Sequence, residues 1–157
     1  MANPIPRTNL TFEEMVPYFE IKGDVRVYEG VSTNDFPANT RQTNVIQTDQ
    51  AWYIRFHWDT KGLLNYLLAG TFKLKLYLEE MGGGEFSLPK NQVDVKFVSK
   101  PNHYVAYMSF RPGDVPAGVY KAVAAMTYEG PTGVPGPVAA FAEIGMLQFY
   151  AEGPTKP

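Results

Sequence analysis

Strict alternation of apolar and polar residues in segments 51–58 and 71–79 is the feature that most constrains the fold. The apolar set of the first segment occupies every second position and consists of Trp52, Ile54, Phe56 and Trp58. The second segment repeats this pattern with Phe72, Leu74, Leu76 and Leu78. Successive side chains of a β-strand point to opposite faces, so a period of two predicts strands in a sheet with one buried and one exposed face.

Residues 117–152 form the second informative stretch. Two β-rich, largely uncharged runs flank the Gly/Pro-rich segment 130–137, which predicts a long terminal hairpin. If Tyr120 faces the core, alternation places Val119, Val123 and Ala125 on the other face. Gly145 is a natural position for a bulge, after which the last strand can return apolar residues to the core. Because both faces of the hairpin are rich in apolar or small residues, more than one surface is expected to meet protein.

Shorter β-type runs fill the rest of the chain. We expect strands at 25–29, 92–98 and 103–110, and a short edge strand within 43–48. A turn is expected at 22–24 and another at 59–62, and residues 63–68 fit a short helical turn that plugs one end of the fold. About seven to nine strands with no long helix predict an all-β, antiparallel β-sandwich. We assign residues 1–20 to an N-terminal arm, 21–152 to one sandwich domain and 153–157 to a tail.

The entry to the penultimate strand carries a specific resemblance. Residues 117–120, A-G-V-Y, resemble the tyrosine corner of immunoglobulin-like and fibronectin-III-like sandwiches, in which a Tyr near the start of strand F bonds back to the preceding loop. Antibody-type domains have Cys two positions after that Tyr, whereas this chain has Ala122. The resemblance implies an Ig-like or fibronectin-III-like topology and no particular function.

Composition excludes several classes of function. The 157 residues carry a formal net charge of −2, which argues against a nucleic-acid partner because phosphate binding needs clustered Lys and Arg. The absence of cysteine excludes disulfides, thiolate nucleophiles and Cys-based zinc sites. The most apolar window, residues 63–78, is interrupted by Gly70, Lys73 and Lys75, so no membrane span is expected. The first residues lack a signal-peptide pattern, which leaves the compartment open with the cytoplasm favoured.

No residue pattern indicates catalysis, a cofactor or a metal. The two histidines, His57 and His103, show none of the close His-x-His or His-x-x-x-His spacings of metal sites, and we interpret both as surface or turn residues. Glu79, Glu80 and Glu85 flank a glycine turn without the alternating Asp/Asn pattern of a calcium loop. No nucleophile–base pair is evident, so we expect a protein that is not an enzyme.

The leading functional hypothesis is a structural or protein-interaction module that self-associates or docks on a protein partner. The docking elements would be the C-terminal hairpin and the N-terminal arm, because both carry more apolar residues than a solvated surface needs. The candidate interface residues are Val119, Val123, Ala125, Phe141, Phe12 and Met15. The alternative, equally open from sequence, is that the arm or the 63–68 turn covers this apolar surface within one subunit.

The second functional hypothesis is a carbohydrate- or small-ligand-binding sandwich. Aromatic rings beside hydrogen-bonding side chains are a common way to hold sugars. The residues expected on outward faces for this purpose are Tyr53, Arg55, Lys75 and Tyr77. Tyr is also an ordinary strand residue, so this pattern alone does not identify a ligand.

Overall fold

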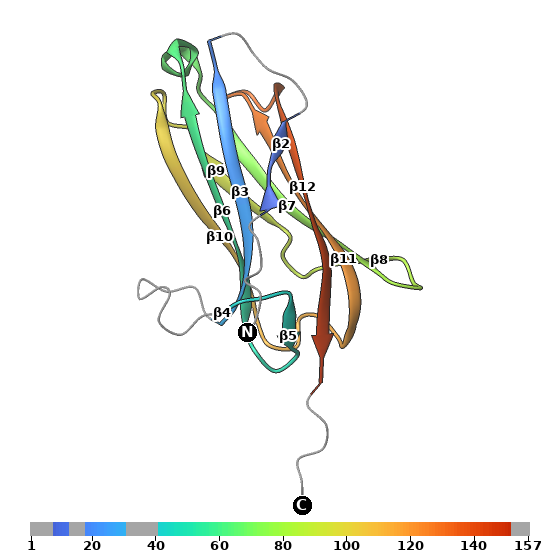
Figure 1. Cartoon of the computed structure of the whole chain (residues 1–157). Coiled ribbons are helices and arrows are strands. Elements are labelled where there is room, and N and C mark those ends of the chain that lie inside the picture. The colour runs from blue at the N-terminus through green and yellow to red at the C-terminus, as the bar shows by residue number, and fades with distance from the viewer. Residues whose placement is uncertain (1–7, 13–17, 31–40, 152–157) are drawn as a thin grey trace, which may run out of the picture.

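The computed structural model describes residues 8–12, 18–30 and 41–151, which form two β-sheets packed face to face (Figure 1). Sheet A contains, in spatial order, β1 (Thr8–Asn9), β3 (Glu20–Glu29), β6 (Trp52–Lys61) and β10 (Asn102–Phe110), with β4 (Arg41–Gln42) paired to β3. Sheet B contains β2 (Thr11–Phe12), β12 (Pro135–Tyr150), β11 (Gly118–Glu129), β7 (Thr71–Glu80) and β8 (Glu85–Phe86), while β5 (Val45–Gln47) pairs with β12 and β9 (Gln92–Lys96) with β7. The predicted all-β sandwich is confirmed.

The alternating strands β6 and β7 supply much of the core. Their predicted inward residues are all at most 2% exposed. Trp58 of β6 stacks on Tyr104 of the same sheet at a centroid distance of 5.0 Å. The Trp58 ring also meets Phe72 of the opposite sheet edge-on at 5.3 Å. These contacts join the two sheets, as the period of two in each strand predicts.

Strand β3 is longer than the sequence pattern predicts. A turn was expected at residues 22–24, but the strand runs without interruption through Glu20–Glu29 and pairs with β6 along its whole length. Gly23 lies opposite Trp58 in this pairing. The expectation of a turn was wrong because the glycine permits a close approach of two strands. The predicted turn at 59–62 likewise begins later, since β6 continues to Lys61.

The described part of the N-terminal arm lies along the edges of its own sandwich. Thr8 and Asn9 pair antiparallel with β3, and Phe12 pairs with Ala140 of β12. The Phe12 side chain packs against the hydrophobic core. These short strands extend the sheets in their own planes, so they leave the outer face of the hairpin uncovered.

The expected edge strand within 43–48 is present as β5. It pairs in parallel with the end of β12, with Val45 opposite Gln148 and Ile46 opposite Phe149. Ile46 is fully buried, so this short strand closes one corner of the core. Residues 63–68 contain the predicted helical turn as a 3₁₀ helix, η1 (Leu63–Leu67).

Tyr120 forms the predicted tyrosine corner. Its hydroxyl donates a 2.9 Å hydrogen bond to the carbonyl oxygen of Pro116, four residues earlier. The ring is fully buried and meets Phe149 edge-on at a centroid distance of 5.6 Å. Burial is the main cause that raises the pKa of the Tyr120 hydroxyl, which keeps it protonated as a donor.

Replacing Tyr120 with Phe should lower the free energy of unfolding by about 1 kcal/mol, because the ring remains but its hydrogen bond to the Pro116 carbonyl is lost. Urea denaturation followed by circular dichroism measures this change. Tyr66→Phe is the matched control, since Tyr66 is 60% exposed and its loss of a hydroxyl should cost less than about 0.5 kcal/mol. Equal effects of the two substitutions would contradict a stabilising corner.

A bulge in β12 allows both halves of the hairpin to contribute to the core. Ala122 lies opposite Gly145 and Val123 lies opposite Glu143, so Ile144 is an extra residue in β12. Gly145 has a φ of 98°, a conformation that favours glycine. Leu147 follows the bulge and is fully buried, which confirms the predicted return to the core.

Candidate functional site

The first candidate site is the outer face of sheet B. Strand register brings together side chains from β7, β11 and β12: Val123 lies between Tyr77 and Glu143, and Ala125 lies between Lys75 and Phe141. We call the apolar members of this surface the hairpin face, which comprises Tyr77, Val119, Val123, Ala125, Phe141 and Met146.

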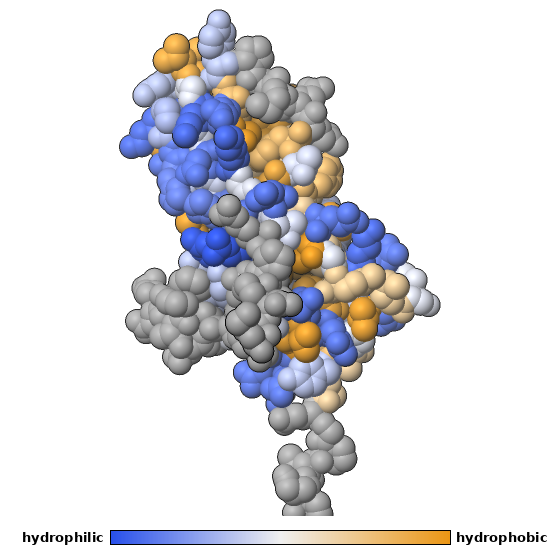
Figure 2. All heavy atoms as spheres, viewed as in Figure 1, coloured by the Kyte–Doolittle hydropathy of each residue, from blue (hydrophilic) through white to orange (hydrophobic). Residues whose placement is uncertain are grey.

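Four residues of the hairpin face are substantially exposed. The exposed fractions are 41% for Tyr77, 39% for Val119, 44% for Phe141 and 46% for Met146. The methyl group of Ala125 is buried among its larger neighbours, and Val123 is half-buried. Figure 2 shows hydrophobic residues interrupted by hydrophilic ones on the side of the sandwich where β11 and β12 lie.

Two lysines beside the hairpin face, Lys121 and Lys73, form ion pairs with acidic neighbours. Lys121 donates to Glu143 at 2.9 Å, and this hydrogen bond raises the pKa of the Lys121 ammonium. Lys73 contacts Asp94 at 2.9 Å and Glu129 at 3.3 Å, and the hydrogen bond to Asp94 is the main cause that raises its pKa. Paired charges give this surface little net charge, which suits contact with another protein surface.

The structure brings together four of the six predicted interface residues. Val119, Val123, Ala125 and Phe141 all belong to the hairpin face. Phe12 lies apart from them, packed against the core from the sheet edge. Met15 falls outside the described residues.

The four residues of the ligand-binding hypothesis do not converge. Tyr53 and Arg55 belong to β6 of sheet A, whereas Lys75 and Tyr77 belong to β7 of sheet B. Tyr53 is fully buried and stacks on Tyr28 at a centroid distance of 5.1 Å, so its ring face is not open to a sugar. Alternation correctly assigned all four residues to the sheet faces that point away from the core, but the expected exposure of Tyr53 was wrong, and the two faces lie on opposite sides of the sandwich.

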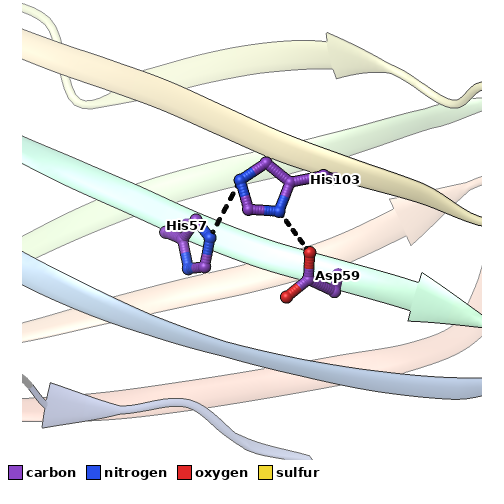
Figure 3. A group of neighbouring side chains, drawn as sticks. All are labelled: His57, Asp59 and His103. Carbon is purple, nitrogen blue, oxygen red and sulfur yellow. Dashed lines mark hydrogen bonds and ion pairs between the residues drawn. The ribbon is translucent and has the colours of Figure 1, made fainter.

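The second candidate site is a cluster of His57, Asp59 and His103 on the outer face of sheet A (Figure 3). Antiparallel pairing of β6 and β10 places His103 opposite Asp59 and His57 opposite Val105. The Nε2 atoms of the two histidines lie 3.1 Å apart, and Nδ1 of His103 contacts Oδ1 of Asp59. On the other side of His57, Oδ2 of Asp24 lies 3.6 Å from its Nδ1 atom.

The cluster borders a hollow of about 410 Å³ that lies over β3 and β6 beside residues 9–12, and Asp24, His57 and Asp59 help to line it. Sequence reasoning missed this grouping because the histidines are 46 positions apart and match no local spacing. The available signal was that both residues occur at outward positions of predicted strands. The two histidines form a site because β6 and β10 are neighbours in sheet A, which the sequence pattern does not reveal.

No protein-family model and no curated protein sequence matches the chain. Among solved structures, it is similar to the C-terminal domain of wzt, with a TM-score of 0.61 and 11% identity over 96% of this chain and 84% of that one. It also matches a CARDB domain from Pyrococcus furiosus, solved in complex with di-metal ions, with a TM-score of 0.46 and 10% identity over 88% of this chain and 100% of that one.

At these identities the likenesses concern the fold alone. In the part of the chain that the structure describes, no helix has the length and apolar character needed to cross a bilayer. The sheet topology, the tyrosine corner and the likeness to the wzt domain together identify an immunoglobulin-like β-sandwich.

Proposed function

We propose that the protein is a non-enzymatic interaction module that associates through its hairpin face, in the first instance with a second copy of itself. The observation that carries the proposal is the group of exposed apolar residues, centred on Phe141 and Val123, on the outer face of three adjacent strands. Solvent-exposed apolar surface of this kind is stabilised when a partner removes it from water.

The charge pattern supports association between identical surfaces. In a two-fold dimer each patch meets its own copy, so an unbalanced charge would meet a like charge. Lys121 already has Glu143 as a neighbour of opposite sign, and Lys73 has Asp94 and Glu129. The acidic neighbours of Lys121 and Lys73 reduce repulsion between two copies of this face, while Phe141 and Met146 supply the apolar contact.

The double substitution Phe141→Lys and Val123→Lys should weaken self-association by about 100-fold or more, because two apolar contacts are replaced by charges that repel across the dimer axis. Sedimentation velocity over a concentration series measures the dissociation constant. Val98→Lys is the matched control: Val98 is 39% exposed but lies in the loop after β9, away from the hairpin face.

The proposal also predicts that the control retains the wild-type dissociation constant. A wild-type protein that stays monomeric at every concentration, together with a double variant that is equally soluble and equally stable, would overturn self-association. An interaction with a different protein would instead appear as a partner that binds the wild type and the Val98→Lys variant but not the double variant.

A further inference from the structure

The two histidines on sheet A are arranged so that the same nitrogen of each ring faces the other. Nδ1 of His103 contacts the Asp59 carboxylate, and Nδ1 of His57 lies 3.6 Å from the Asp24 carboxylate. An ionised carboxylate only accepts hydrogen bonds, so Nδ1 of His103 carries the hydrogen in its contact with Asp59, and the nearby Asp24 carboxylate favours the same tautomer of His57. In a neutral ring, this tautomer leaves a lone pair on Nε2.

Either a shared proton or a metal ion can lie between the facing Nε2 atoms. These atoms lie 3.1 Å apart, and two lone pairs at this distance repel each other. Two imidazole nitrogens bound to one zinc ion, each about 2.0–2.1 Å from the metal in tetrahedral geometry, lie roughly 3.3 Å apart. The observed separation is close to that of two ligands of a single ion.

We propose that His57 and His103 bind a zinc-class divalent transition metal ion through their Nε2 atoms. Asp59 and Asp24 stand behind the two rings, in the position where a carboxylate fixes the tautomer and orientation of a ligating histidine. Imidazole nitrogen favours zinc, copper and nickel, whereas calcium and magnesium favour oxygen ligands.

The scaffold holds these groups on regular strands. Asp24, His57 and Asp59 come from the paired strands β3 and β6, and His103 comes from the adjoining strand β10. Donor atoms of His57, Asp59 and His103 all lie within 4.8 Å of one another. Neighbouring strands position side chains more precisely than loops do. The two rings therefore need little rearrangement to bind an ion.

The site is open to an ion and to a further ligand. The side chain of His103 is 61% exposed and that of His57 is 23% exposed. Two protein nitrogens leave coordination positions for water or for a donor atom of another molecule, and the hollow beside Asp24, His57 and Asp59 gives access to them. This arrangement suits reversible binding.

The test uses the full chain without an affinity tag, freed of metal with a chelator and titrated with zinc chloride by calorimetry. One zinc ion per chain is expected. His57→Gln or His103→Gln should each weaken binding by more than about 100-fold, and Asp59→Asn by about 10–100-fold, since loss of a ligand exceeds loss of the carboxylate behind it. Glu85→Gln, an exposed carboxylate on β8 of the other sheet, should bind zinc as the wild type does.

Imidazole ¹⁵N NMR of the wild type gives a second readout. Zinc should shift the Nε2 signals of both histidines and leave hydrogen on both Nδ1 atoms, and calcium should shift neither. Equal zinc affinity in the wild type and the His57→Gln, His103→Gln double variant would overturn the proposal. Spectra unchanged by zinc, with a proton shared between the two Nε2 atoms, would overturn it as well. Circular dichroism shows whether each variant is folded.

Discussion

Replacing Trp58 with Ala should lower the free energy of unfolding by about 3–5 kcal/mol. The Trp58 ring is fully buried between the sheets, stacked on Tyr104 and in edge contact with Phe72. Removing the indole leaves a cavity, because the regular strands on both sides cannot move in to fill it. The free energy lost with the packing contacts is therefore added to that lost with burial of the ring. Urea denaturation should show a lower midpoint with an unchanged slope.

Two companion substitutions separate cavity formation from other effects. Trp58→Phe keeps most of the ring volume and should cost less than about 1.5 kcal/mol. Tyr66→Ala removes an aromatic ring that is 60% exposed and should also have a small effect. If Trp58→Ala were no more destabilising than Tyr66→Ala, close packing of the two sheets around Trp58 would be refuted.

Local patterns in the sequence were sufficient to predict strands β6 and β7 and their buried faces. A period of two is a property of one strand, so Trp58 and Phe72 could be placed in the core without knowing which strands pair. The tyrosine corner is also local, because the Tyr120 hydroxyl reaches only four residues back to Pro116. The bulge at Gly145 was predictable for the same reason.

The candidate sites depend on strand pairing, which these local patterns do not encode. Alternation placed Tyr53 and Tyr77 on outward faces, but β6 and β7 belong to different sheets, so the two rings lie on opposite sides. His57 and His103 showed no motif, yet β6 and β10 are neighbours in sheet A and bring their rings together. Which strand lies beside which is decided by packing of the whole chain.

Gly23 shows that a glycine can serve either a turn or the close approach of two strands. Between Lys22 and Asp24 a glycine suggests a turn, because glycine adopts turn conformations freely. In the structure it lies within β3, where a Cβ atom would be 2.5 Å from the carbonyl oxygen of His57 and 2.7 Å from the Cβ atom of Trp58. The glycine is needed for close approach of β3 to β6, and this approach also places Asp24 behind His57.

Gly23→Ala should therefore lower the free energy of unfolding by about 3 kcal/mol, at the upper end of the usual cost of overpacking, because the added methyl group meets backbone that cannot rotate away. Gly84→Ala is the matched control, since its added Cβ atom meets nothing within 4 Å, and it should change stability by no more than about 0.5 kcal/mol. Because the clash also involves His57, any folded Gly23→Ala protein should bind zinc more weakly than the Gly84→Ala protein. Equal stability of the two variants in urea would show that β3 and β6 do not approach as closely as their register requires.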